Sequence, residues 1–425
     1  MITGEDIVCI SVMDWDWPFW TSRQHLMARF ASQNRVIFVN PPLTFANDYI
    51  GACKDARLRR KLFSWAIHGG IVRYGENLLV WTPPPCIPFN RIRDRFLFSR
   101  LLELNQRLFR RSLQKALAEA GVREPILWAS FNVYFADAVV GRLGEKLSIY
   151  HCTDEINGFP GYSPYISEIE ARLAARCNLV LSTSEVLMTS KASINPSSYF
   201  VPNGADVELF AKAVTWDGRE PEDLHAIPPP RAGFVGQIEY RFDCDLLRYT
   251  ANTLTSWSFV LIGPVQAGNE DIEKLRDLPN VHFLGLKDRW MLPGYLAYLD
   301  VALIPYKINR LTQGIYPLKL YEYLAAGRPV VATPIPALKA VDGMIYLGKD
   351  GPSFAEAIVR ANEEDGPEQA LKRSEAALSH SWAHRAEVIS EIITTFLDSR
   401  SKARDNGRHS LSKQVSLDVM NISVL

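Results

Sequence analysis

The stretch from residue 314 to residue 333 reads GIYPLKLYEYLAAGRPVVAT, and it predicts the fold of the C-terminal half of the chain. Pro317 suits the first turn of a helix, and Gly327 suits the position just after the last turn. Pro329 then opens an apolar run that has the length of a strand. This order of loop, helix, turn and strand is typical of a parallel sheet whose strands are connected by helices.

The same alternation of strand-length apolar runs and helix-length segments extends through most of the chain. The strand-length runs occur at residues 7–12, 35–40, 78–82, 126–130, 147–150, 179–183, 199–202, 232–236, 258–263, 281–284, 301–305, 329–333 and 344–347. We therefore predict an α/β protein with two Rossmann-like, doubly wound domains.

The predicted domain boundaries follow from a break in this alternation. Residues 204–230 are charged and end in three consecutive prolines, which is typical of a linker. The N-terminal domain is then expected at residues 1–203 and the C-terminal domain at 231–381. A helical pattern at 382–398 is expected to return to the N-terminal domain, and the polar residues 399–425 are expected to form a disordered tail.

The composition of the 425-residue chain is that of a globular protein, with 47% hydrophobic and 22% charged residues. No apolar run approaches the roughly 20 residues that a membrane-spanning helix needs. The N-terminus lacks the basic segment of a secretory signal. The six cysteines are scattered without a metal-binding spacing, which indicates reduced thiols. Together these features predict a cytoplasmic protein.

Residues 50–115 carry about ten more basic than acidic residues, although the net charge of the chain is zero. Apolar and aromatic residues alternate with the cations in this segment, and that composition suits the surface of an anionic membrane. A solvated helix face would give the same pattern, so both interpretations stay open. No nucleic-acid recognition motif accompanies the charge, and nucleic acid is therefore not an expected partner.

The predicted helix that begins near Pro317 offers what a nucleotide diphosphate needs. Its N-terminus points free backbone N–H groups and the positive end of the helix dipole toward the carboxyl end of the strand at 301–305. Lys319 in the first turn adds a cation, and Glu322, one turn on, can accept hydrogen bonds from ribose hydroxyls. An ordinary helix-surface pair between Lys319 and Glu322 is the simpler alternative.

Here the sequence resembles glycosyltransferase family 4 and its relatives in bacterial capsule, teichuronic acid and exopolysaccharide assembly. Residues 322–331, EYLAAGRPVV, are similar to the second Glu of the Glu-x7-Glu element of that family and to the turn and strand that follow. The first Glu would fall at Gly314, where the chain departs from the pattern. Residues 201–206, VPNGAD, resemble the turn after the last N-terminal strand, and residues 232–237, AGFVGQ, resemble the first C-terminal strand with its glycine-ended loop.

The resemblance implies a GT-B fold, in which the two domains face each other across a cleft. It implies that a sugar is transferred from a nucleotide-sugar, UDP- or GDP-linked, to a saccharide acceptor of surface polysaccharide. The basic and aromatic segment of the N-terminal half adds a lipid-linked acceptor and a peripheral position on the inner face of the plasma membrane as hypotheses for this cytoplasmic protein. No metal ion and no cofactor besides the donor is expected. The predicted donor-binding residues are Glu322, Lys319, Tyr316, Pro317, Leu318, Gly236, Gln237 and Arg241.

The loop after the first predicted strand is rich in aromatic residues and carboxylates, at residues 13–21. Aromatic faces stack on sugar rings, and carboxylates accept hydrogen bonds from sugar hydroxyls. We therefore predict that Asp14, Trp15, Asp16 and Trp17 bind the acceptor; the alternative is a packed lid over the sheet. Asp14 and Asp16 have the spacing of a metal-binding pair, but they lie in the half that is not expected to hold the donor.

Two candidate catalytic residues follow the strand at 147–150, namely His151 and Asp154. The carboxyl end of a parallel strand is where active-site groups collect. In an inverting enzyme either group would accept the proton of the acceptor hydroxyl, with Asp154 favoured because a lone histidine is more often structural. In a retaining enzyme the same groups would position the sugar. The sequence leaves both outcomes open.

Other proteins with two Rossmann-like halves supply the alternatives. The dehydrogenase reading is disfavoured because no glycine follows the first strand at residues 13–18. A periplasmic binding protein would need an export signal. A non-hydrolysing UDP-sugar 2-epimerase and a catalytically degenerate nucleotide-sugar-binding subunit stay open as alternatives.

Overall fold

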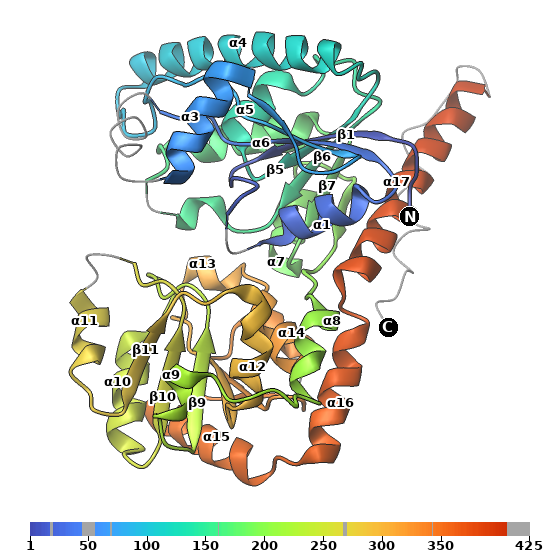
Figure 1. The fold of residues 1–425 in the computed structure, drawn as a ribbon. Helices are drawn as coiled ribbons and strands as arrows, with labels where there is room; N and C mark the ends of the chain where they lie inside the picture. Colours follow the sequence, from blue (N-terminus) through green and yellow to red (C-terminus); the bar gives the residue numbers. More distant parts are fainter. Residues whose placement is uncertain are drawn as a thin grey trace. The chain divides into compact units, whose positions relative to one another are not determined.

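The computed structural model describes residues 1–17, 20–44, 56–68, 70–159, 161–266, 270–341 and 343–405. The chain forms two compact units. The first unit comprises Met1–Pro202 and the chain from Arg385 onward, and the second unit comprises Asn203–His384. Each unit has its own sheet covered by helices (Figure 1). None of the described helices is long and apolar enough to cross a membrane.

The sheet of the first unit has eight strands in the order β3-β4-β2-β1-β5-β6-β7-β8. All neighbouring strands are parallel except β3, which pairs antiparallel with β4. The strands are β1 Asp6–Ser11, β2 Arg35–Val39, β3 Ile71–Arg73, β4 Leu78–Trp81, β5 Ile126–Ser130, β6 Leu147–Cys152, β7 Leu179–Ser182 and β8 Ser198–Phe200. The sequence did not predict β3, because two of its three residues are exposed and it shows no apolar run.

Helices cover both faces of this sheet, which explains why its strands are apolar on both sides. Figure 1 shows α4 over one face and α1 on the opposite face. Val8 and Ile10 of β1 join the core under α4 to α6, whereas Phe30 of α1 contacts Trp128 on the other side. The helices are α1 Ser22–Phe30, α3 Ala56–His68, α4 Arg95–Glu119, α5 Val133–Val139, α6 Ile166–Arg176, α7 Glu185–Ala192 and α17 Trp382–Asp405, with a short 3-10 helix η1 Ile156–Gly158.

The sheet of the second unit has six parallel strands in the order β11-β10-β9-β12-β13-β14. The strands are β9 Arg231–Val235, β10 Ser258–Ile262, β11 Val281–Gly285, β12 Val301–Ile304, β13 Val330–Ala332 and β14 Tyr346–Leu347. Helix α10 packs against α11 and α15, and α14 packs against α8 and α16. The helices are α8 Val207–Phe210, α9 Glu222–His225, α10 Cys244–Thr253, α11 Glu270–Arg276, α12 Leu292–Ala297, α13 Arg310–Gln313, α14 Leu318–Ala325, α15 Gly351–Glu363 and α16 Pro367–Leu378, with 3-10 helices η2 Ala211–Ala213, η3 Arg289–Met291 and η4 Pro336–Val341.

Two segments differ from the sequence-based expectation. Residues 204–230, expected as a linker, are part of the second unit, because Leu209, Phe210 and Leu224 of the short helices α8 and α9 are buried there. The last helix, α17, continues to Asp405 instead of ending at 398. Residues 399–405 contain neither glycine nor proline, so nothing in the sequence stops the helix before that point. The remaining part of the expected tail, 406–425, lies outside the described residues.

Candidate active site

Three neighbouring strands of the second unit end at glycines with positive φ. Gly236 follows β9 (φ +147°), Gly263 follows β10 (φ +140°) and Gly285 ends β11 (φ +68°). The backbones are in close contact, since the Gly236 N–H donates to the Ile262 carbonyl at 2.7 Å and a Cβ on Gly263 would collide with the Gly236 carbonyl oxygen. Only glycine fits at Gly236 and Gly263, and the three glycines form a backbone ledge, the glycine ledge, at the carboxyl ends of the strands.

The N-terminal end of α14 brings a cation to this ledge. The Lys319 side chain lies directly across Gly236. Its Cε and Nζ atoms occupy the space that a Cβ on that glycine would need. The Lys319 ammonium is 5.3 Å from the centre of the Phe234 ring on β9. The N–H groups of a first helical turn have no partner within the helix, and Pro317 provides no side-chain cap for those of α14. Ammonium and free N–H groups together form an anion-binding arrangement.

Glu322 lies one turn further along α14, between opposing charges. Its side chain is partly exposed. Burial raises the pKa of the Glu322 carboxyl, and the positive charges of Lys319 and then Arg289 oppose this shift. Arg289, on η3 after β11, forms an ion pair with Asp206 at 2.5 Å between Nη2 and Oδ2. Asp206 belongs to the turn at residues 201–206. The Asp206–Arg289 ion pair therefore connects this turn electrostatically with Glu322.

Sequence reasoning did not identify Arg289. It follows the strand β11 in a segment without a recognisable motif, and only the sheet order brings it beside the start of α8 and the middle of α14. Among the predicted residues, Arg241 is held by an ion pair with Glu239. Gln237 is exposed beside the glycine ledge. Gly314, where the family pattern has its first Glu, forms the C-terminal cap of α13.

The residues just before α14 have mainly structural contacts. The Tyr316 hydroxyl is 2.5 Å from the Tyr321 hydroxyl, and the Tyr321 ring stacks on His380 with 3.9 Å between ring centres. Asn203 Nδ2 donates to the Tyr316 carbonyl at 2.8 Å. Tyr316 and Pro317 are buried, whereas Leu318 is partly exposed. These contacts fix the loop that orients the first turn of α14.

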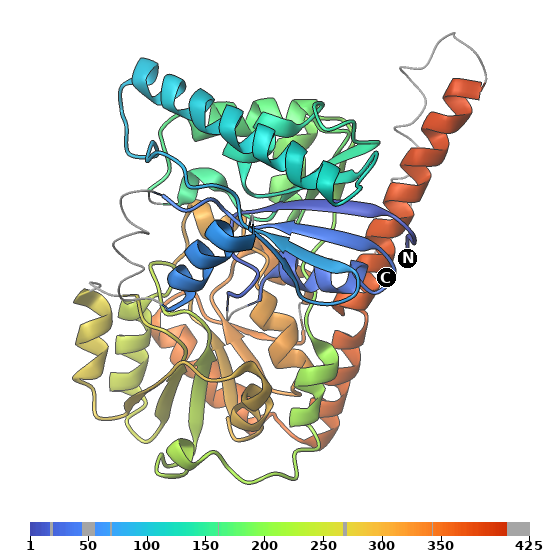
Figure 2. The same cartoon turned by 45° about the horizontal axis from the view of Figure 1, so that its top comes forward.

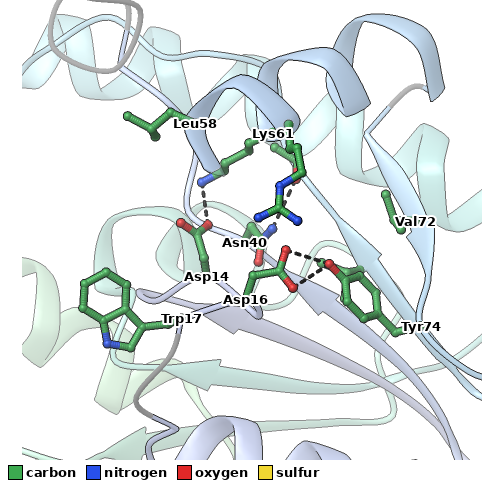
Figure 3. Close-up of a pocket in the computed structure, with 11 residues that line it drawn as sticks. Asp14, Asp16, Trp17, Asn40, Leu58, Lys61, Val72 and Tyr74 are labelled. Carbon is green, nitrogen blue, oxygen red and sulfur yellow. Dashed lines mark hydrogen bonds and ion pairs between the residues drawn. The ribbon is translucent and has the colours of Figure 1, made fainter. Parts of the chain in front are cut away.

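A second polar site lies in the first unit, in a cavity of about 380 Å³ beside the loop that follows β1. Figure 3 shows Asp14 paired with Lys61 of α3, and Asp16 paired with Tyr74. The Lys61 Nζ atom is 2.6 Å from Asp14 Oδ1, and the Tyr74 hydroxyl is 2.6 and 2.7 Å from the two Asp16 oxygens. The cavity is lined by Asp14, Asp16, Trp17, Asn40, Leu58, Arg60, Lys61, Val72, Tyr74, Val80 and Thr82.

The structure divides the predicted acceptor-binding loop into two parts. Asp14, Asp16 and Trp17 line the cavity. Trp15 does not, because its ring is only 6% exposed and packs on Phe38 with 5.1 Å between ring centres. Its backbone N–H donates to Asn40 Oδ1 at 2.9 Å, so Trp15 anchors the loop to the sheet. Pro18 and Phe19 of this loop lie outside the described residues.

Arg23 of α1 connects the carboxyl ends of two strands in the first unit. Its guanidinium donates to Ser130 Oγ at 3.1 Å and to Thr153 Oγ1 at 3.2 Å. The group is almost fully buried, and burial lowers its pKa, while the charge of Asp154 opposes that shift most strongly. Asp154 is partly exposed and accepts a hydrogen bond from Thr153 Oγ1 at 3.2 Å. Arg23 and Asp154 are therefore electrostatically coupled, and the sequence did not predict this pair.

His151, the other predicted catalytic residue, is buried within electrostatic reach of Arg23. It is 2% exposed and contacts Trp128 edge-on, with 5.4 Å between ring centres. Burial, and then the charge of Arg23, lower the pKa of His151 to about 3. Its Nδ1 atom has no hydrogen-bond partner among the described residues. The imidazole is therefore neutral near pH 7 and screened from solvent.

Backbone strain marks the same edge of the sheet. Phe131, which follows β5, has φ +61°, a conformation that bulky residues avoid. Its neighbour Asn132 donates from Nδ2 to the Ser11 carbonyl at 2.8 Å, which ties the end of β5 to the end of β1. Strain of this kind collects at ligand sites.

In the described part of the chain no group of three or more His, Cys, Asp and Glu side chains is arranged to hold a metal ion.

Comparison with solved structures identifies the fold. Sucrose-phosphate synthase from Thermosynechococcus elongatus matches with a TM-score of 0.67 at 15% identity, over 93% of this chain and all of that chain. HepE from Anabaena, solved in complex with UDP, matches with a TM-score of 0.60 at 15% identity, over 92% of this chain and all of that chain. These likenesses confirm the predicted GT-B class of fold, with two α/β units built on parallel sheets.

The sequence comparisons identify the chain as a glycosyltransferase. Residues 229–364 match the family of glycosyl transferases group 1, and this region contains both the glycine ledge and α14. The chain is also 26% identical over 356 residues to the putative teichuronic acid biosynthesis glycosyltransferase TuaH of Bacillus subtilis (strain 168), covering 78% of this chain and 81% of that protein. The predicted resemblance is thereby confirmed.

Proposed function

We propose that this glycosyltransferase moves a sugar from a UDP- or GDP-linked donor to a saccharide or lipid-linked acceptor during synthesis of a surface polysaccharide. The observation that carries the proposal is the position of Lys319 across Gly236 at the N-terminal end of α14, with Glu322 one turn further along the same helix and within electrostatic reach of Lys319. Two comparisons support it: HepE is described in complex with UDP-glucose, and TuaH is named for teichuronic acid biosynthesis.

In the proposed donor site, the diphosphate lies on the ledge formed by Gly236 and Gly263. The Lys319 ammonium and the free N–H groups of α14 balance its charge, which grows as the bond between the sugar and the diphosphate breaks. Glu322 accepts hydrogen bonds from the ribose hydroxyls and must be ionised to do so at full strength. Lys319 and Arg289 favour that ionised form against the effect of burial.

In the proposed acceptor site, sugar hydroxyls donate to Asp14 and Asp16, and the Trp17 ring provides a stacking face in the cavity of the first unit. We assign the acceptor-side chemistry to Asp154, which is partly exposed, rather than to His151, which is buried and neutral. In an inverting reaction Asp154 takes the acceptor proton as the new bond forms. In a retaining reaction the diphosphate takes that proton and Asp154 orients the sugar.

We further propose that the reaction needs no cofactor beyond the donor and no metal ion. Support comes from the local cation supply, since Lys319 and the N-terminus of α14 already face the position assigned to the diphosphate. The proposed place of action is the cytoplasmic face of the membrane. Sugar transfer that continues unchanged in the presence of a chelator such as EDTA would agree with a reaction that needs no metal ion, and transfer that stops would contradict it.

Calorimetric titration with UDP-, GDP- and dTDP-sugars tests the donor assignment. We expect one nucleotide class to bind the wild-type protein and Glu322→Ala to weaken its binding by about tenfold or more, because a charge-assisted hydrogen bond is lost. Glu356→Ala changes an exposed glutamate on α15 and serves as the matched control. Unchanged binding by Glu322→Ala, or no binding by any donor, would overturn the assignment.

Product analysis separates the proposal from its two alternatives. A glycosyltransferase consumes the nucleotide-sugar only when an acceptor is present, apart from slow hydrolysis. Conversion of a UDP-sugar to its epimer without acceptor would identify an epimerase. Binding without any turnover, across acceptors that include lipid-linked saccharides, would identify a degenerate subunit.

A further inference from the structure

Helix α4 of the first unit has two apolar stripes, and only one of them is packed. Phe98, Leu102, Phe109 and Leu113 face inward and belong to the hydrophobic core. Leu97, Leu104 and Leu108 are 48%, 43% and 46% exposed, and Phe96 at the start of the helix is 70% exposed. The outer leucines are therefore not needed to build the core.

The outer leucines form a continuous line on the helix. Leu97, Leu101, Leu104 and Leu108 follow one another at intervals of four, three and four residues, which places them on one side of an α-helix. Leu101 lies at the inner edge of this line and is partly buried against the core, whereas the other three are exposed. With about 100° of rotation per residue, this line lies roughly a third of a turn away from the inner stripe. Figures 1 and 2 show α4 as the outermost element on its face of the first unit.

Arginines flank this line. Arg100, Arg107 and Arg111 are each exposed and recur at seven- and four-residue intervals next to the outer leucines. A single carboxylate, Glu103, faces them, at 2.5 Å from Arg107 and 4.0 Å from Arg100. Arg111 forms no ion pair with any of the residues that the structure describes. The face therefore keeps a net positive charge, and exposed Arg91 and Arg93 precede it in the sequence.

We infer that the outer face of α4 docks on an anionic lipid surface. The outer face comprises Phe96, Leu97, Arg100, Leu101, Leu104, Arg107, Leu108 and Arg111. Leucine and phenylalanine side chains enter the boundary between head groups and acyl chains, while the arginines contact lipid phosphates. The long arginine side chains reach those phosphates while their methylene groups cover apolar surface.

Charge complementarity favours lipid over a second copy of this chain. A symmetric contact between two copies would bring the same face against itself, and the arginines of one copy would meet those of the other. An anionic membrane has the opposite charge and an apolar interior for the leucines. The biological role of this docking rests on the proposed function: it would hold the enzyme at the surface where a lipid-linked acceptor lies.

Vesicle flotation of the full chain tests the inference. We expect binding to vesicles of phosphatidylcholine mixed with phosphatidylglycerol, weaker binding at high salt, and little binding to phosphatidylcholine alone. The double variants Leu97→Ser/Leu104→Ser and Arg100→Gln/Arg111→Gln are each expected to lower binding by about tenfold or more. Control variants are Leu371→Ser/Leu378→Ser, at exposed leucines of α16, and Arg219→Gln.

Three results would overturn the inference. Equal binding by wild type and both α4 variants would show that another surface contacts lipid. Equal binding to neutral and anionic vesicles would contradict the role of the arginines. A dimer in sedimentation experiments that the leucine variant abolishes, without vesicle binding, would identify a second copy as the partner. Donor binding is measured on the same samples, so a protein that binds vesicles but no nucleotide-sugar would contradict the proposed function alone.

Discussion

The two candidate sites of this chain are assembled in different ways. In the second unit, Lys319 and Glu322 are three residues apart on α14, and Gly236, which Lys319 contacts, directly follows β9. In the first unit, Arg23 contacts Ser130 and Thr153, which are 107 and 130 residues away in the sequence. A site built on one helix can be recognised from the sequence, whereas a site that joins several strands appears only in the fold.

The two sites also differ in electrostatics. Lys319 and Glu322 on α14 are both partly exposed, and the Lys319 side chain lies across Gly236. Arg23 and His151 are almost fully buried, and burial is the main cause that lowers the pKa of each. This difference agrees with the proposal that the second unit binds the charged donor directly, while buried groups of the first unit position the partly exposed Asp154.

The largest expected effect comes from removing the cation of the donor site. Lys319→Met keeps most of the side-chain volume over Gly236 but removes the charge that balances the leaving diphosphate. We expect kcat/KM for the donor to fall by about 10²- to 10³-fold. Steady-state kinetics with the donor identified by calorimetry provides the measurement.

Lys61→Met in the first unit is the matched comparison, since Lys61 pairs with Asp14 in the cavity. There we expect a change of about tenfold or less, confined to the KM of the acceptor. Lys372→Met, at an exposed position of α16, should leave both parameters unchanged. A large effect of Lys61→Met on the donor would show that the two units do not divide the substrates as proposed.

Arg289 provides a smaller effect with a defined pH dependence. Burial already raises the pKa of Glu322, and Arg289 opposes that shift, so Arg289→Gln should raise the pKa further. Because the proposed donor site uses the ionised carboxylate, we expect the affinity for the donor to fall as the pH drops through the Glu322 pKa. In the variant this fall should begin at a higher pH and lower the affinity by about tenfold at mildly acidic pH.

Calorimetry of donor binding as a function of pH measures this shift. Asp206→Asn removes the ion-pair partner of Arg289 and also one negative charge near Glu322. It should therefore not shift the curve in the same direction as Arg289→Gln. Superimposable pH curves for wild type and Arg289→Gln would show that Arg289 does not act on Glu322.

The donor half of the site could be predicted because its information is local. The helix expected after Pro317 is α14, and the glycine expected at the end of its strand is Gly236. Arg289 was missed because its role depends on the sheet order, which places β11 two strands away from β9. No spacing in the sequence records that proximity.

The acceptor half was predicted less completely, for a related reason. An aromatic residue in a loop has the same sequence signature whether it points into a cavity or into the core. Trp17 lines the cavity, while Trp15 is buried on Phe38. The Asp16 partner Tyr74 comes from the segment between β3 and β4, which carries no pattern that would link it to the loop.

The smallest expected effect concerns His151 and tests whether the first unit holds a buried, neutral imidazole. The pKa of His151 is about 3 in the folded protein, against 6.5 for an ordinary histidine. Between these values the unfolded chain binds a proton that the folded protein does not, so the free energy of unfolding decreases as the pH falls below about 6.5. At about pH 5 this contribution amounts to about 2 kcal/mol, and it is absent above about pH 7.

Urea unfolding at several pH values measures this effect. The free energy of unfolding should decrease less steeply toward acidic pH for His151→Gln than for wild type. A wild-type kcat/KM profile with a titration near pH 6.5 that this variant abolishes would instead make His151 an accessible base, and the contrast between the two sites would no longer hold.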